Sequence, residues 1–252
     1  MTRALFPWLA LLGASCGGRT EVMEYHANGK PASYAVQDAE GRAHGTWTLW
    51  HPNGLKLREG AYERDLREGT WTWWFPGGRK ALEGAYRGGR REGRWTEWNE
   101  NVLEAFEGRY EDGLLEGPCT WWHPTGAVWK TGLMRSGAEE GPWTFGWEEG
   151  GTWMEGEYRG GRREGPWQAW YPGGERLWEG SYRDGRREGT WTFWHRSGEE
   201  WLLGRYEGGR RAGPWLAGTP EGELEPEETG LYADGERVRA LGPDELEALA
   251  PR

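Results

Sequence analysis

Aromatic and threonine residues alternate with turn-forming residues along most of this chain. The segment Gly69–Glu92, GTWTWWFPGGRKALEGAYRGGRRE, shows the pattern: an aromatic, threonine-rich run, a Pro-Gly-Gly turn, a second run ending in Gly-Ala-Tyr, and a charged, glycine-rich turn. Threonine and aromatic side chains suit the half-buried surface of a sheet, and the glycine-rich stretches suit tight reversals. The glycine spacing excludes a helix. Each such segment therefore predicts a β-hairpin of two antiparallel strands.

The hairpin unit recurs every 24 residues without insertion or deletion. Strict periods of this length indicate stacked repeats rather than one mixed core. We therefore predict an all-β fold, an elongated antiparallel meander of 24-residue hairpin repeats. The opening glycines of the repeats are Gly45, Gly69, Gly93, Gly117, Gly141, Gly165, Gly189 and Gly213. A second series follows at Gly60, Gly84, Gly108, Gly132, Gly156, Gly180 and Gly204.

The repeat register predicts four segments along the chain. Residues 1–16 form a signal peptide, and residues 17–44 a linker with a degenerate first repeat. Residues 45–212 contain seven full repeats, and residues 213–252 a degenerate eighth repeat followed by a cap or tail. Residues 243–249 are expected to form a short helix within that tail. Such caps are typical of repeat arrays, whose terminal units have one neighbour only.

Strand alternation assigns the aromatic residues to two faces. Trp71 and Trp73 share one face, whereas Trp74 points to the other. The second glycine series lacks side chains, which lets a neighbouring aromatic ring lie flat across the backbone. A single sheet with aromatics on both faces leaves tryptophan surface exposed unless the sheet coils or pairs with another copy, so a homodimer is one expectation. The predicted binding surface is the second tryptophan row: Trp74, Trp98, Trp122, Trp170 and Trp194.

Composition narrows the class of protein. The chain carries a formal net charge of -10, which disfavours nucleic-acid binding. Its mean hydropathy is -0.94, yet 21 tryptophans argue for a folded, aromatic-stabilised structure rather than a disordered one.

The N-terminal sequence MTRALFPWLALLGASC has the composition of an export signal. Its end, Gly13–Cys16, resembles a bacterial lipoprotein signal, in which Cys16 becomes the lipidated first residue of the mature chain. Such signals usually place leucine three residues before the cysteine, whereas Leu12 lies four before it. Cleavage by an ordinary signal peptidase is the alternative, and an uncleaved anchor or a misassigned start the remaining one. The first two readings place the array outside the cytoplasm.

Residues that could bind a metal or act in catalysis recur with the repeat and do not cluster in one site. His51, His123 and His195 lie three repeats apart, roughly 29 Å at two strands per repeat, too far to share a metal. Cys119 stands at the position that tryptophan occupies in the other repeats, and we interpret it as a packing residue. No metal, cofactor or catalytic residue is predicted, because no nucleophile, base and orienting group stand outside the consensus.

Paired arginines stand in the charged turns just before several of the opening glycines. They suggest either an edge that meets anionic headgroups or a partner's carboxylates, or solvated turns in which the adjacent glutamates neutralise them. The interleaved acidic residues favour solvated turns. The pairs are Arg90 and Arg91, Arg162 and Arg163, Arg186 and Arg187, and Arg210 and Arg211.

The segments Glu83–Tyr86 and Glu179–Tyr182, with the glycines that follow them, resemble the Glu-Gly-x-Tyr signature of MORN repeats. Gly165-Pro166-Trp167 with the turn that follows is similar to the bacterial MORN variant of YwqK-type antitoxins. The resemblance implies a hairpin array used for protein or lipid-surface contacts, without catalytic residues. The sequence departs from the pattern at Met134 and Gly146, so a bulge or kink is expected near residues 141–151.

These observations predict a non-catalytic binding or scaffolding protein at the bacterial cell envelope, anchored in a membrane by Cys16 and contacting a protein partner or an envelope surface. A carbohydrate or cell-wall binding module is one alternative, since tryptophan faces stack on sugars. An antitoxin-like intracellular binder is another, which an export signal disfavours. A hydrolase would need a repeat-breaking pocket, for which residues 141–156 are the candidate place.

Overall fold

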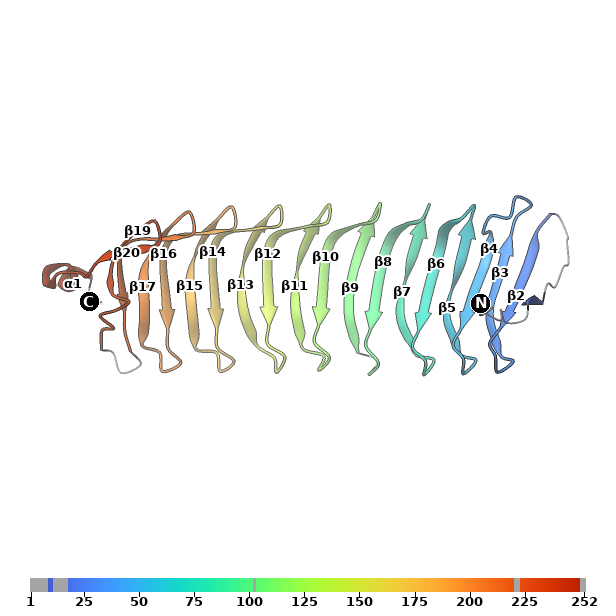
Figure 1. Cartoon of the computed structure of the whole chain (residues 1–252), viewed down its shortest axis with the longest axis horizontal. Helices are drawn as coiled ribbons and strands as arrows, with labels where there is room; N and C mark the ends of the chain where they lie inside the picture. The colour runs from blue at the N-terminus through green and yellow to red at the C-terminus, as the bar shows by residue number, and fades with distance from the viewer. Residues whose placement is uncertain (1–8, 11–17, 102, 220–222, 250–252) are drawn as a thin grey trace, which may run out of the picture. The chain divides into compact units, whose positions relative to one another are not determined.

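The computed structural model describes residues 9–10, 18–101, 103–219 and 223–249. The chain divides into two compact units, residues 1–126 and 127–252, which are described separately. Both units are built from antiparallel hairpins (Figure 1), and the one helix in the described part of the chain is short. The predicted all-β meander of hairpin repeats is therefore confirmed within each unit.

In the first unit each strand from β2 to β10 pairs antiparallel with the next one in sequence. A two-residue strand, β1, pairs with β2 at its other edge. The strands are β1 (Leu9–Ala10), β2 (Thr20–Tyr25), β3 (Pro31–Gln37), β4 (Gly45–Trp50), β5 (Lys56–Glu63), β6 (Leu66–Trp74), β7 (Lys80–Arg87), β8 (Arg90–Trp98), β9 (Glu104–Glu111) and β10 (Leu114–Trp122).

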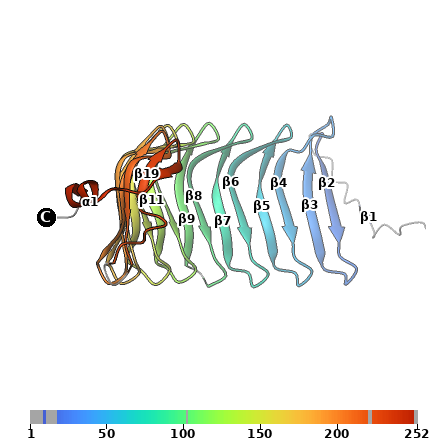
Figure 2. The ribbon, with the colours of Figure 1, turned by 60° about the vertical axis from the view of Figure 1, so that its left-hand side comes forward.

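The second unit continues the same plan from β11 to β20, again with each strand paired to the next. Helix α1 (Pro243–Leu249), at the residues expected from the sequence, follows the last strand (Figure 2). The strands are β11 (Val128–Arg135), β12 (Ala138–Gly146), β13 (Thr152–Arg159), β14 (Arg162–Trp170), β15 (Arg176–Arg183), β16 (Arg186–Trp194), β17 (Glu200–Glu207), β18 (Arg210–Ala217), β19 (Gly230–Ala233) and β20 (Glu236–Arg239).

The opening glycine of each repeat forms a β-bulge. Between β7 and β8 the pairing passes from Gly84 opposite Trp95 directly to Ala85 opposite Glu92, so Gly93 and the residue after it have no partner on β7. Gly93 has a φ of +70°, a left-handed conformation that favours glycine. All eight opening glycines have positive φ: Gly45, Gly69, Gly93, Gly117, Gly141, Gly165, Gly189 and Gly213.

The second glycine series supports the tryptophans of the next strand. A Cβ on Gly84 would lie closer than 3.0 Å to the Trp95 ring, so the indole lies directly against the glycine backbone. The Trp95 indole N–H donates to the carbonyl of Ala85, 3.1 Å away, next to the bulge. Equivalent bonds hold Trp47, Trp71, Trp143, Trp167, Trp191 and Trp215. The predicted flat packing of an aromatic ring over glycine is confirmed.

The core lies on one side of the sheet, which we call the aromatic face. Trp95 and Trp191 are 0% exposed although no second layer covers them within the described residues. Their cover comes from neighbouring strands, because tyrosines stand edge-on to the indoles, as Tyr86 does at 5.0 Å from Trp95. The opposite side, the polar face, carries threonine and glutamate on the same strands.

Two repeats carry a different residue at a consensus tryptophan position, namely Cys119 and Gly146. Cys119 is 3% exposed in the tryptophan slot opposite Gly108, and the Phe106 ring takes the space over that glycine. Gly146 does follow a register shift, as expected. The same shift precedes Trp74, Trp98 and Trp170, however, so it marks no special kink at Gly146.

Candidate functional site

The predicted tryptophan row lies on the polar face at the ends of the first strands of the repeats. Each of its members is half-buried, whereas six tryptophans of the aromatic face are at most 1% exposed. A cation lies over two of the rings, Lys56 at 5.6 Å from the Trp74 centroid and Arg176 at 5.6 Å from that of Trp194. The row members are Trp74, Trp98 and Trp122 in the first unit and Trp170 and Trp194 in the second.

Polar ladders connect neighbouring strands on this face. Thr72 donates to Glu83 at 3.0 Å, and Lys80 lies 2.6 Å from the same carboxylate. Burial alone would raise the pKa of Glu83, but the hydrogen bonds from Lys80 and Thr72 outweigh it and lower that pKa. Glu83 therefore stays ionised, paired with Lys80 and Thr72.

A groove of about 670 Å³ hollows the polar face of the second unit across β12 to β16. It is lined by hydroxyl, amide and carboxylate groups, among them Thr144, Glu155, Gln168 and Glu179. Gln168 donates to Glu155 at 2.7 Å, so that carboxylate has an amide partner where its counterparts in the first unit have cations. The groove overlaps residues 141–156, the stretch named for a pocket, but extends over further repeats.

The arginine pairs divide between two environments. The first arginine is exposed near the turn, as Arg162 is, with its guanidinium 3.7 Å from Asp184. The second points to the aromatic face: the Arg163 guanidinium lies 4.6 Å from the Trp167 ring centroid and donates to the Tyr182 hydroxyl at 2.9 Å. The expectation of solvated turns is therefore right for the first arginine and wrong for the second, because a planar guanidinium stacks on indole.

The histidines link successive hairpins. His51 Nε2 lies 3.0 Å from the carbonyl of Trp74, and His195 Nε2 lies 3.2 Å from that of Gly218. Tyr171 fills the same slot and donates to the carbonyl of Trp194 at 3.0 Å. Within the described residues no three His, Cys, Asp or Glu side chains gather to hold a metal ion.

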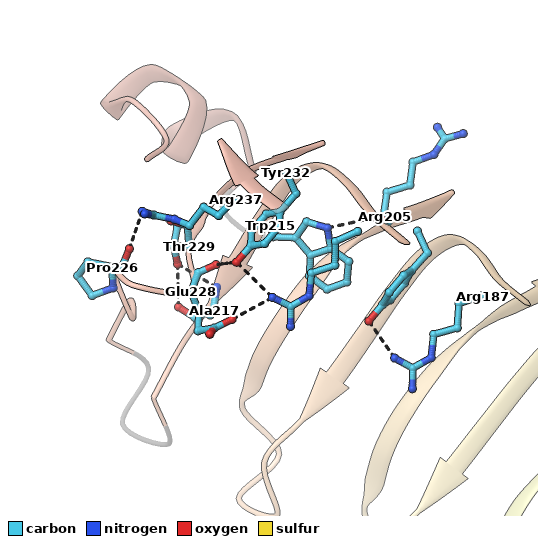
Figure 3. A network of polar contacts seen from close by, with 11 residues as sticks. Arg187, Arg205, Trp215, Ala217, Pro226, Glu228, Thr229, Tyr232 and Arg237 are labelled. Carbon is cyan, nitrogen blue, oxygen red and sulfur yellow. Dashed lines mark hydrogen bonds and ion pairs between the residues drawn. The ribbon is translucent and has the colours of Figure 1, made fainter. Parts of the chain in front are cut away.

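A polar cap closes the second unit beyond β18 (Figure 3). Thr229 accepts from the Ala217 N–H at 3.0 Å and donates to its carbonyl at 3.2 Å. Glu228 accepts from Arg211 at 2.9 Å. The sequence predicted a cap or tail in residues 213–252 but not the strand pair β19–β20, although Gly230-Leu231-Tyr232 repeats the Gly-x-Tyr signature two residues out of register.

Cys16, the predicted lipidation residue, lies outside the described residues, as does most of the predicted signal peptide. None of the helices found among the described residues is long and apolar enough to span a bilayer.

Comparison with known proteins gives no family. No protein-family model and no curated protein matches the chain. Among solved structures, a chain of the TcdB2–TccC3–Cdc42 complex matches 82% of this chain at 12% identity, with a TM-score of 0.19. This chain spans 14% of that one, and a likeness so weak supports no argument about fold or function.

Proposed function

We propose that the chain is a non-catalytic binding or scaffolding protein of the bacterial cell envelope, exported and attached to a membrane through lipidated Cys16. The supporting observation is that tryptophans on the two faces differ in exposure. Six tryptophans of the aromatic face, Trp167 and Trp191 among them, are at most 1% exposed, whereas Trp170 and Trp194 keep accessible surface on the polar face. A row of half-buried indoles spaced at multiples of the 24-residue repeat suits multivalent contact with a partner.

The experiment is co-sedimentation of the full chain with purified bacterial membranes, intact or stripped of exposed protein by protease. We expect Trp170→Ser/Trp194→Ser to lose binding to intact membranes while keeping its fold, as read by circular dichroism. Trp167→Ser, on the aromatic face, is the matched control and should lose thermal stability instead. Unchanged binding by a folded Trp170→Ser/Trp194→Ser protein would remove the row from the binding surface.

Attachment and localisation are tested separately by labelling with radioactive fatty acid in a bacterial host. The wild type should take up the label and Cys16→Ser should not. An unlabelled protein in the cytoplasm would contradict the envelope proposal and favour the antitoxin-like intracellular binder.

A carbohydrate or cell-wall module is the second candidate, and the groove of the second unit favours it, because hydroxyl, amide and carboxylate groups such as Thr144, Gln168 and Glu179 bind sugar hydroxyls. Co-sedimentation with purified peptidoglycan sacculi distinguishes it. Binding to sacculi that Gln168→Ala and Glu155→Ala abolish would support a cell-wall ligand, and binding to untreated membranes alone would exclude it.

A further inference from the structure

Three arginines of the second unit occupy one repeated environment on the aromatic face. Each guanidinium lies 4.6–4.7 Å from the centroid of the tryptophan four residues later and donates to the hydroxyl of a tyrosine on the next strand. Each residue is half-buried, and the Arg211 side chain keeps 25% exposure. The three are Arg163, Arg187 and Arg211, and we call them the guanidinium row.

One member of the guanidinium row already holds a carboxylate. Glu228, in the turn at residues 226–228 between β18 and β19, accepts from Arg211 at 2.9 Å, while the same arginine donates to the Tyr232 hydroxyl at 3.2 Å. Arg163 and Arg187 form no ion pair with any described residue, although their stacking and tyrosine bonds are the same. Arg211 thus shows what the two others can accept.

The charge of the row is maintained by its surroundings. Burial would lower the pKa of Arg163, but hydrogen bonds to the hydroxyls of Tyr158 and Tyr182 raise it. The stacked indole adds a cation–π contact and holds the guanidinium plane in place. Arg163 and Arg187 are therefore oriented guanidinium donors without a counter-ion among the described residues.

We propose that Arg163 and Arg187 bind an extended acidic segment of a partner protein, with carboxylates placed as Glu228 is placed on Arg211. Successive members of the row are two strands apart, about 9.6 Å. An extended polyproline-II chain advances roughly 9.3 Å over three residues and returns side chains to the same side with that period. The segment that fits carries a carboxylate at every third residue. This inference rests on the proposed binding function and gives it a partner chemistry.

The position of the row favours a peptide over a bilayer. A membrane surface would meet the outer arginines first, since the Arg162 side chain is 68% exposed near the turns, whereas Arg163 is recessed against Trp167. A narrow chain with single carboxylates reaches the recessed guanidinium groups, as the segment carrying Glu228 does.

The test is calorimetric titration of the full chain with an acetylated, amidated peptide of sequence Glu-Pro-Gly-Glu-Pro-Gly-Glu and with its all-Gln counterpart. We expect the acidic peptide alone to bind, and Arg163→Gln/Arg187→Gln to weaken it by about tenfold or more. Arg162→Gln/Arg186→Gln removes the same charge from the neighbouring exposed arginines and is the matched control, with an expected change of less than about threefold. Arg163→Lys/Arg187→Lys should also weaken binding, because lysine lacks the planar fork.

A second variant keeps the test decisive if the arginine variants do not fold. Glu228→Gln frees Arg211 without touching the tryptophan stack, so the peptide should bind it about three times more tightly than the wild type. The proposal would be overturned if both arginine double substitutions weakened peptide binding equally, or if Glu228→Gln left the peptide affinity unchanged. Binding to anionic lipid vesicles but not to the peptide would also overturn it. These outcomes leave the tryptophan row of the polar face intact, so they do not decide the membrane experiment above.

Discussion

Substituting alanine for Gly84 tests the contact on which the aromatic face is built. A Cβ there would come closer to the Trp95 ring than the 3.0 Å below which something must shift, and Trp95 is 0% exposed with its N–H bonded to Ala85. Overpacking in a filled core costs about 1–3 kcal/mol, and expelling a buried tryptophan costs about 3–5 kcal/mol. We therefore expect Gly84→Ala to destabilise β7 and β8 by about 3 kcal/mol.

Gly77→Ala is the matched control for this substitution. Gly77 lies in the preceding turn of the same repeat with nothing within 4 Å of its added Cβ and without a positive φ. Its substitution should change stability by about 0.5 kcal/mol or less. The assay is native-state hydrogen exchange of the β7 and β8 amides, because repeat arrays unfold in parts and a global midpoint averages over them.

A double-mutant cycle with Trp95→Leu identifies the cause. If the overlap with the indole carries the cost, Gly84→Ala should destabilise the Trp95→Leu protein much less than it destabilises the wild type, since the smaller side chain leaves room for the methyl group. Equal protection losses for Gly84→Ala and Gly77→Ala, or strictly additive effects in the cycle, would refute the reasoning.

Three further substitutions probe the turns and the C-terminal cap. Gly189→Ala places a side chain at a φ of +71° and should cost about 1–2 kcal/mol in urea unfolding, and an unchanged midpoint would contradict the bulge geometry. Thr229→Val leaves the buried Ala217 N–H without its acceptor and should lower stability by about 1–3 kcal/mol, whereas Thr229→Ser should be nearly neutral. The hydrogen bond from Arg239 lowers the pKa of Glu245 to about 2, so its stabilising contribution is full above the unfolded pKa near 4.5 and disappears as pH falls toward 2. Carbon-13 NMR titration of the Glu245 carboxyl should give that low pKa and Arg239→Gln should raise it, and an ordinary value in the wild type would contradict the ion pair.

Much of the fold can be predicted from the sequence because each repeat contains its own turn and packing residues. The opening glycine predicts a turn-like backbone, and the glycine before each tyrosine predicts an aromatic ring above it, as at Gly84. The second arginines were missed although strand alternation assigns them, because Arg163 stands four residues before Trp167 and the two unpaired residues of the bulge keep that parity. A cap was predicted for residues 213–252, but its strand β19 was missed because Gly230 lies two residues out of the 24-residue period.

The order in which glycine and tryptophan appear has a consequence for how the chain folds. Gly84 precedes Trp95, and the carbonyl that receives the indole N–H also lies on the earlier strand. Each new repeat therefore docks on a surface already synthesised, and no repeat waits for a distant segment. Growth can proceed in chain order while the ribosome is still translating, with short-range contacts that close quickly. The array can therefore fold repeat by repeat, from the N-terminal end, during synthesis.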